Sequence, residues 1–278
     1  MSRSFSFLFC LIFSTALIPF VSTAQKKASS KEEAKIAKHQ RINEMIRNEE
    51  EGVPAFSKQN LTAIKNHHDG WGLLFEKGIS KTPYNTTIFQ FEIGEKQHRK
   101  EQKQSTSGGI TGGFAYFGRP FVFGKQNIFY QAKLGMGKQV MIGGKSNKNG
   151  VAVYGIFVGG VTAGLIRPYY LQFSTDTGAT YLKYGASTRD AFLNQDQKLD
   201  IIGGSGISKG WNEIKFNPGI YAKTGLRFDW ARFNQVVSAV EVGFMADFYS
   251  QKVVQMIDLP GKSFFPTGYL ALNFGRRK

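Results

Sequence analysis

Cysteine is nearly absent from this chain, because its 278 residues contain only Cys10. That residue lies in an N-terminal segment that we expect to be cleaved, so the mature protein would have no disulfide and no thiolate metal site. Secretion without disulfides argues against a small extracellular domain held together by cross-links. Proline is also scarce, at 8 residues, whereas glycine reaches 32 and aromatic residues 14%. This mixture is typical of proteins with many strands and with aromatic residues at a membrane interface.

Acidic residues are outnumbered, with 20 Asp and Glu against 36 Lys and Arg, which gives a net charge of +16. In an intracellular protein this balance would indicate nucleic-acid binding. Export removes the chain from nucleic acid, so we expect no such partner. The acidic partners at a cell surface are lipid headgroups and anionic polysaccharide. We therefore expect contacts with outer-membrane lipids and lipopolysaccharide.

Residues 1–24 have the pattern of an export signal. Arg3 supplies the positive charge, residues 5–20 are apolar, and Ser22-Thr23-Ala24 offers small residues for cleavage before Gln25. The apolar run is about 16 residues, shorter than the roughly 20 that a membrane-spanning helix needs, so an uncleaved anchor is disfavoured. We expect a mature chain in the outer membrane of a Gram-negative bacterium.

Residues 25–69 form a polar extension that we expect to lie in the periplasm. Ser30 and Glu33 make a capping box and predict a helix there, which Gly52 and Pro54 would end. The helix has only a thin apolar stripe. It is either a solvated spacer or a docking element for a protein partner.

Two-residue alternation begins at Gly70 and recurs to the C-terminus. One face of each repeat is apolar and uncharged over about 9–11 residues, the length that a tilted membrane strand needs. The opposite face carries glycine and both signs of charge, which favours apolar residues toward lipid. Seven strands are recognisable. If both ends of the barrel chain lie on the periplasmic side, the number of strands must be even, so we expect one more strand, in 53–69 or 111–123. The predicted fold is an all-β membrane protein, an antiparallel transmembrane β-barrel of about eight strands over 70–278, preceded by a short helix.

The connectors between the predicted strands fall into two classes. Residues 78–85, 143–150 and 229–234 are short and rich in Gly, Asn and Lys, whereas 96–126, 174–212 and 251–264 are longer and more polar. Short turns on one side and long loops on the other are typical of outer-membrane barrels.

Residues 150–166 form the one uncharged run that also fits a membrane helix. Gly155/Gly159 and Gly160/Gly164 have the spacing of closely packed membrane helices. The many β-branched residues of the run favour a strand instead. The strand is our prediction, and the helix stays open as the alternative.

Several charged side chains would face the interior of the barrel. An eight-stranded barrel is just wide enough to be filled by its own side chains. Because an unpaired buried charge is costly, we expect these groups to pair and block the lumen, Arg227 and Lys223 with Glu241 and Asp247. The alternative is a narrow channel for small solutes. The predicted lumen charge network is Glu76, Glu92, Lys133, Lys223, Arg227, Asp229, Glu241 and Asp247.

The sequence offers little for catalysis or for a cofactor. His67-His68-Asp69 is the only metal-like cluster, and because adjacent residues rarely converge on one ion, a solvated linker is the better interpretation. Gly203-Gly204-Ser205-Gly206 lacks the Lys-Ser/Thr of a phosphate loop and reads as a flexible surface turn. We expect no enzyme activity, no metal and no cofactor.

The last strand carries a predicted assembly signal. Leu270, Leu272 and Phe274 alternate toward lipid, and a terminal aromatic strand is what barrel-assembly machinery captures by strand addition. We expect this machinery to be a partner during insertion. Residues 276–278 lie beyond Phe274 and would sit among lipid headgroups.

Five segments of residues 70–278 carry a resemblance to known proteins: Gly124-Lys125-Gln126-Asn127, Ile142-Gly143-Gly144-Lys145, Arg167-Pro168-Tyr169-Tyr170, Ile201-Ile202-Gly203-Gly204-Ser205-Gly206 and Phe274-Gly275-Arg276-Arg277-Lys278. In these segments the sequence resembles the small outer-membrane β-barrels of the Bacteroidetes phylum. That resemblance implies the fold, the membrane and a structural or accessory place in protein export or barrel assembly, without an activity.

Overall fold

The computed structural model divides the chain into two units, residues 1–55 and 56–278. The predicted signal peptide, with Cys10, lies outside the described residues, as do Ser30, Glu33, Gly52 and Pro54. Residues 35–40 are helical, in agreement with the helix predicted there. The described residues are 32, 35–40, 43, 56–82, 84–105, 110–111, 114–115, 119–145, 150–175, 178–189, 192, 201–231 and 235–278.

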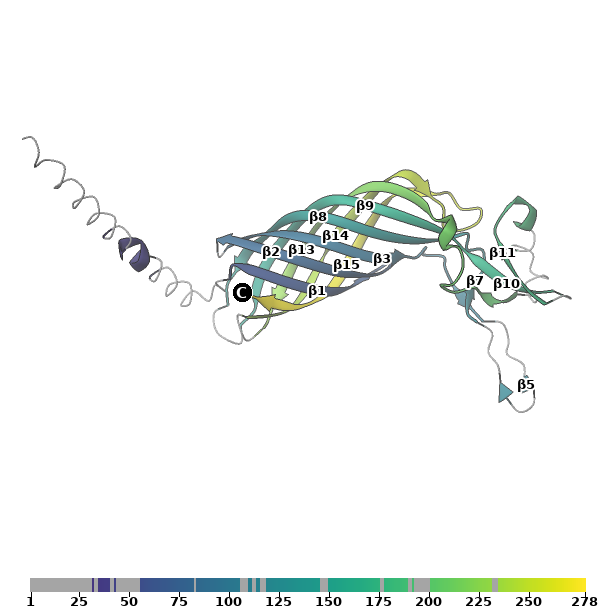
Figure 1. The fold of residues 1–278 in the computed structure, drawn as a ribbon, viewed down its shortest axis with the longest axis horizontal. Coiled ribbons are helices and arrows are strands. Elements are labelled where there is room, and N and C mark those ends of the chain that lie inside the picture. The colour runs from purple at the N-terminus through teal and green to yellow at the C-terminus, as the bar shows by residue number, and fades with distance from the viewer. Residues whose placement is uncertain are drawn as a thin grey trace, which may run out of the picture. The chain divides into compact units, whose positions relative to one another are not determined.

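The second unit contains a closed antiparallel barrel of eight strands, which confirms the predicted fold class (Figure 1). Neighbouring strands follow the order β1-β15-β14-β13-β9-β8-β3-β2, so the first strand pairs with the last and no edge is left open. The strands are β1 (Lys58–His67), β2 (Gly70–Thr82), β3 (Asn85–Lys96), β8 (Asn127–Gly143), β9 (Ala152–Pro168), β13 (Lys215–Asp229), β14 (Val236–Val253) and β15 (Lys262–Arg277).

Strand β1 is the strand that the even count required. It lies within 53–69, so the barrel begins at Lys58 and the predicted boundary at residue 70 was too late. His67 is its last residue, and the interpretation of His67-His68-Asp69 as a solvated linker was wrong. The strand escaped recognition because its outward face carries Asn60, Thr62 and Asn66, which hide the alternation.

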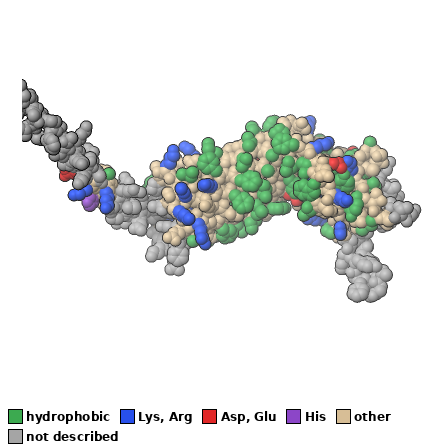
Figure 2. Space-filling view, in the orientation of Figure 1, with side chains coloured by type: hydrophobic (Ala, Val, Ile, Leu, Met, Phe, Trp, Pro, Cys, Tyr) green, Lys and Arg blue, Asp and Glu red, His purple; other side chains and the backbone are tan. Residues whose placement is uncertain are grey.

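Side chains alternate between an apolar outer face and a polar interior, as the two-residue period predicted. Phe244 of β14 is 74% exposed, whereas its neighbour Met245 is buried. Figure 2 shows hydrophobic side chains spread over the outside of the barrel. The large exposed apolar residues on the strands include Trp71, Phe75, Phe89, Phe91, Leu134, Phe157, Val161, Ile220, Val242, Phe248, Leu270, Leu272 and Phe274.

Strand β9 explains the uncharged run at 150–166. Its outward side chains Phe157 and Val161 are exposed, and its inward side chains Tyr154, Ile156 and Val158 pack with Ile88 and Tyr221 inside the barrel. Both faces are therefore apolar, and the period is hidden. No helix among the described residues is long and apolar enough to cross a membrane.

The two ends of the barrel differ. At the short-turn end lie the connectors 83–84, 144–151 and 230–235 together with both ends of the barrel chain, β1 and β15. The long-loop end carries 97–126, 169–214 and 254–261, with 68–69 as a tight turn among them. Apart from that turn, the asymmetry is the predicted one.

The described residues of 97–126 and 169–214 include short strands at this end, and we call them the cap. Strands β10 (Tyr170–Thr175), β11 (Gly178–Lys183) and β12 (Ile201–Gly204) form one sheet, and the other cap strands pair as β4 (Lys103–Gln104) with β7 (Phe121–Val122) and as β5 (Ile110–Thr111) with β6 (Phe114–Ala115). Figure 1 shows β7, β10 and β11 beyond the end of the barrel opposite the C-terminus.

Strand β12 changes the interpretation of Gly203 to Gly206. Ile201 and Ser205 are buried, and Gly203 adopts a φ of 157° where the backbone of Arg119 approaches closely. This stretch is part of the packed cap, so the predicted flexible surface turn was wrong.

Candidate functional site: the charged lumen

Arg227, on β13, lies at the centre of the lumen and is 1% exposed. Its two terminal nitrogens donate to the two carboxylate oxygens of Glu76 at 2.8 and 2.7 Å. Its Nε and Nη2 donate to Oε2 of Glu241 at 2.9 and 2.7 Å, and Nη1 also donates to Gln139. These bonds use all five N–H groups of the guanidinium, so the buried charge is fully compensated.

The two carboxylates that hold Arg227 have further donors. Glu76 accepts hydrogen bonds from the amides of Gln59 and Gln90, at 3.0 and 2.6 Å. Glu241 accepts one from the Tyr269 hydroxyl at 2.8 Å and pairs with Lys223 at 3.2 Å. The cluster thus links side chains of seven barrel strands, all except β9, across the lumen.

A second cluster lies toward the long-loop end. Lys65 pairs with Glu92 at 2.6 Å, and Lys133 pairs with Asp247 at 2.6 Å. Lys96 bridges Asp247 and Asp69, at 3.2 and 3.0 Å. Together the two clusters hold five cations and five anions, all with a partner of opposite sign within 4.0 Å: Lys65, Lys96, Lys133, Lys223 and Arg227 against Asp69, Glu76, Glu92, Glu241 and Asp247.

The short-turn end has its own buried pair. Arg277, the last residue of β15, pairs with Asp229 at 2.8 Å, and its guanidinium lies 4.7 Å from the centre of the Phe56 ring. Lys145 donates to the carbonyl of Ala231 and lies 3.9 Å from Asp229. The prediction that residues 276–278 all sit among headgroups was therefore wrong for Arg277, because β15 continues past Phe274 and turns this side chain inward.

All eight residues of the predicted lumen network are buried inside the barrel. The structure places Arg227 and Lys223 against Glu241, as expected, but Asp247 lies with Lys96 and Lys133 instead. Glu76, Glu92, Lys133 and Asp229 also have partners of opposite charge, as described above. Leu270, Leu272 and Phe274 of the predicted assembly signal are exposed on the outer face.

Sequence reasoning missed Lys65, His67 and Lys96. The first two lie on β1, and Lys96 ends β3 just where the predicted strand had stopped. His67 is buried with its Nε2 3.7 Å from Glu92. Among the described residues, no group of three or more His, Cys, Asp or Glu side chains could hold a metal ion.

Arg167 joins the barrel to the cap. It lies near the end of β9, opposite Ile128 in the register and on the same side of the strand as Phe157 and Val161, and its guanidinium donates to the carbonyls of Ile207 and Gly206 at 2.9 and 3.2 Å. It lies 5.5 Å from the centre of the Tyr130 ring and 4.8 Å from that of Trp211. Stacking a guanidinium on aromatic rings is a typical cation–π arrangement, and it fixes the loop containing Gly206 over the barrel rim.

The surface of the cap carries an exposed ion pair. Glu213 accepts hydrogen bonds from the Tyr170 hydroxyl, at 2.6 Å, and from the ammonium of Lys183. The bond from Lys183 lowers the pKa of the Glu213 carboxyl, and the same bond raises the pKa of Lys183. Both side chains are exposed, so solvent screens the pair.

No protein-family model matches the chain, and no curated protein matches it in sequence. Solved structures that resemble it include the attachment invasion locus protein Ail of Yersinia pestis, at 10% identity over 80% of this chain and 95% of that one, with a TM-score of 0.33. Neisserial surface protein A matches at 7% identity over 80% and 94%, with a TM-score of 0.35. The N-terminal β-barrel domain of Pseudomonas aeruginosa OprF matches at 8% over 78% and 96%, with a TM-score of 0.30. The resemblance to barrels of the Bacteroidetes phylum stays a prediction.

Proposed function

We propose that this protein is a non-enzymatic structural barrel of the outer membrane whose lumen is closed and whose cap faces the outside of the cell. The observation that carries the proposal is the charge network. Arg227 has no unused N–H group, and the cations and anions of the two clusters are equal in number. A solute path would need mobile water along these groups, whereas paired, buried side chains fill the interior.

The membrane placement rests on the outer face. A broad apolar surface with exposed Phe, Leu and Val side chains would be costly in water, and it covers strands of 10 to 18 residues. Both ends of the barrel chain lie at the short-turn end, which we place in the periplasm, so that residues 25–55 would extend into the periplasm. The segments that resemble Bacteroidetes barrels include Lys125, Arg167 and Arg277, which anchor the cap and close the barrel.

We further propose an accessory role in protein assembly or export at the outer membrane, reached through the cap or through residues 25–55. Tagged protein purified from native membranes after cross-linking should retain a defined envelope protein. A variant lacking residues 25–55 but retaining the signal should lose that partner if the extension binds it, and should keep it if the cap does.

Location and topology are tested in the same cells. We expect the protein in the outer-membrane fraction, with a gel mobility that shifts on heating as closed barrels do, and with a cap that protease removes from intact cells. Recovery in the inner membrane, or a cap protected from external protease, would overturn this placement. Planar-bilayer recording discriminates the scaffold from the narrow channel that is its alternative.

A further inference from the structure

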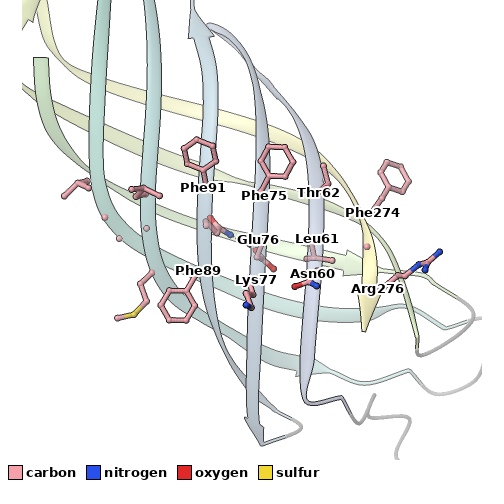
Figure 3. Close-up of a pocket in the computed structure, with 18 of the residues that line it drawn as sticks. Asn60, Leu61, Thr62, Phe75, Glu76, Lys77, Phe89, Phe91, Phe274 and Arg276 are labelled. Carbon is pink, nitrogen blue, oxygen red and sulfur yellow. Dashed lines mark hydrogen bonds between the residues drawn. The ribbon is translucent and has the colours of Figure 1, made fainter. Parts of the chain in front are cut away.

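The outer wall of the barrel has a groove of about 1020 Å³ across β15, β1, β2, β3, β8 and β9. Its volume is at the upper end of the roughly 300–1,000 Å³ that ligand sites occupy. Figure 3 shows Phe91, Phe75 and Phe274 in one row and Phe89, Lys77 and Arg276 in a second, with Leu61 and Glu76 between the rows.

The row farther from the short-turn end is apolar except at one position. Strand register places Phe274, Thr62, Phe75 and Phe91 side by side on β15, β1, β2 and β3. The rings of Phe75 and Phe91 stack with centroids 6.4 Å apart. Thr62 is much shorter than the phenylalanines on either side, so it leaves a slot between Phe274 and Phe75 (Figure 3).

The second row begins at the charged side chain of Arg276 and ends at Gly159, where there is room for a larger side chain. Register places Arg276 opposite Asn60, Asn60 opposite Lys77, and Lys77 opposite Phe89. It continues through Met136 to Gly159. A Cβ added at Gly159 would meet only the carbonyl oxygen of Tyr221, at 3.9 Å.

This row also runs along the barrel wall, from the short-turn end toward the middle of the barrel. Arg276 is the next-to-last residue of β15, and Asn60 lies near the start of β1, so both are at the short-turn end. Gly159 and Met136 lie near the middle of β9 and β8. The groove thus runs from a basic pair at the membrane boundary to apolar side chains at mid-membrane depth.

Lys77 and Arg276 are two strands apart, about 10 Å at the usual strand spacing. Both are exposed on the outer face, and among the described residues neither forms an ion pair. Lys278 also lines the groove. The only acidic side chain among the described lining residues is Glu76, whose carboxylate points inward to Arg227. Basic side chains on a lipid-facing wall are tolerated near the membrane boundary but costly at the bilayer midplane, and Lys and Arg side chains at the boundary attract anionic headgroups.

We propose that this groove binds one anionic glycerophospholipid of the periplasmic leaflet. Its phosphate would lie between Lys77 and Arg276 beside Asn60, where a guanidinium can hold two phosphate oxygens. Its acyl chains would follow the groove past Phe89 and Met136 toward Gly159. The inference rests on the proposed membrane placement but is independent of whether the lumen conducts.

Native mass spectrometry of the delipidated barrel in detergent, titrated with dioleoylphosphatidylglycerol, tests the site. We expect one lipid retained per barrel, with at least tenfold weaker retention of dioleoylphosphatidylcholine and no retention of soluble glycerol 3-phosphate. The double variant Lys77→Gln/Arg276→Gln should weaken phosphatidylglycerol binding about tenfold or more. Gly159→Phe should weaken it from the acyl-chain end.

Lys138→Gln is the matched control, because Lys138 is an exposed basic residue of β8 outside the groove. It should bind phosphatidylglycerol as the unmodified protein does, and heat-shifted gel mobility shows that each variant is folded. Equal retention by the double variant, or by Gly159→Phe, would overturn the proposal. So would equal binding of the zwitterionic lipid, or a dimer in which a second copy covers the groove. A barrel that binds no lipid yet fractionates with the outer membrane would refute the site and leave the proposed function intact.

Discussion

The middle of the barrel lumen buries Arg227, Lys223 and Glu241, whereas the cap buries Leu171, Phe192 and Ile201 around a common apolar core. Both regions belong to the same chain and exclude solvent. They differ because the barrel wall presents its apolar side chains outward, which leaves polar residues for the inside. Once the chain leaves the wall, the pattern of a water-soluble protein returns, with apolar residues inside. Whether lipid or water surrounds the outer face of a region therefore decides whether its core is polar or apolar.

The largest effect should come from removing the centre of the lumen network. Arg227→Ala leaves Glu76 and Glu241 buried and short of their main partner, and breaking a buried pair costs about 3–5 kcal/mol. We expect a lower midpoint in the heat-shifted gel assay and in urea unfolding from micelles. Lys138→Ala, on the outer face of the same barrel, should change little. Equal midpoints for Arg227→Ala and the unmodified protein would mean that the network contributes nothing to stability.

Leu171→Ala tests the other core. Leu171 is fully buried in the cap, and truncation of a buried leucine costs about 2–5 kcal/mol. That loss should open the cap locally, so limited proteolysis should cut between residues 169 and 214 faster while the barrel keeps its heat-shifted mobility. A simultaneous loss of barrel mobility would show that the two cores fold as one cooperative unit.

Arg277→Ala tests the end of the lumen. The change removes the ion pair with Asp229 and leaves that buried carboxylate with the backbone N–H of Ala231 and the more distant Lys145, a penalty of about 1–3 kcal/mol. Deleting residues 276–278 should cost more, because the backbone of Lys278 also bonds to Ser57 and Lys58 of the first strand. Arg276→Ala is the control with the side chain outward. Equal unfolding midpoints for Arg277→Ala and Arg276→Ala would contradict the inward role.

The smallest effect belongs to the exposed pair on the cap. Glu213→Gln should leave the unfolding midpoint unchanged, because solvent screens Lys183 and Glu213. The folded pKa of Glu213 is lowered, so any stability from the pair is present above the carboxyl's unfolded pKa and is lost as the pH falls through the folded pKa. Because solvent screens the pair, we expect this contribution to be small at any pH. The rate of cap proteolysis, measured at neutral pH and at pH below 4, should differ little between Glu213→Gln and the unmodified protein.

The lumen was largely predictable because alternation assigns every second residue to one face. On β13 and β14 that rule places Lys223, Arg227, Glu241 and Asp247 inside. The alternation could not predict which charged side chains pair, since Asp247 forms ion pairs with Lys96 and Lys133 on strands that are distant in sequence. It failed on β1, where both faces carry polar residues. It could not predict the cap, whose core joins Phe121, Phe192 and Ile257 from three separate loops.

The central claim is that paired charges close the lumen, and ion conduction measures this most directly. The purified protein, reconstituted in planar bilayers beside a porin that shows the sensitivity of the assay, should give no resolvable current steps. Glu76→Ala/Arg227→Ala/Glu241→Ala, which removes the central cluster, should leak more. Steady currents through the unmodified barrel, with a selectivity that Lys223→Glu shifts toward cations, would contradict the account and establish a channel.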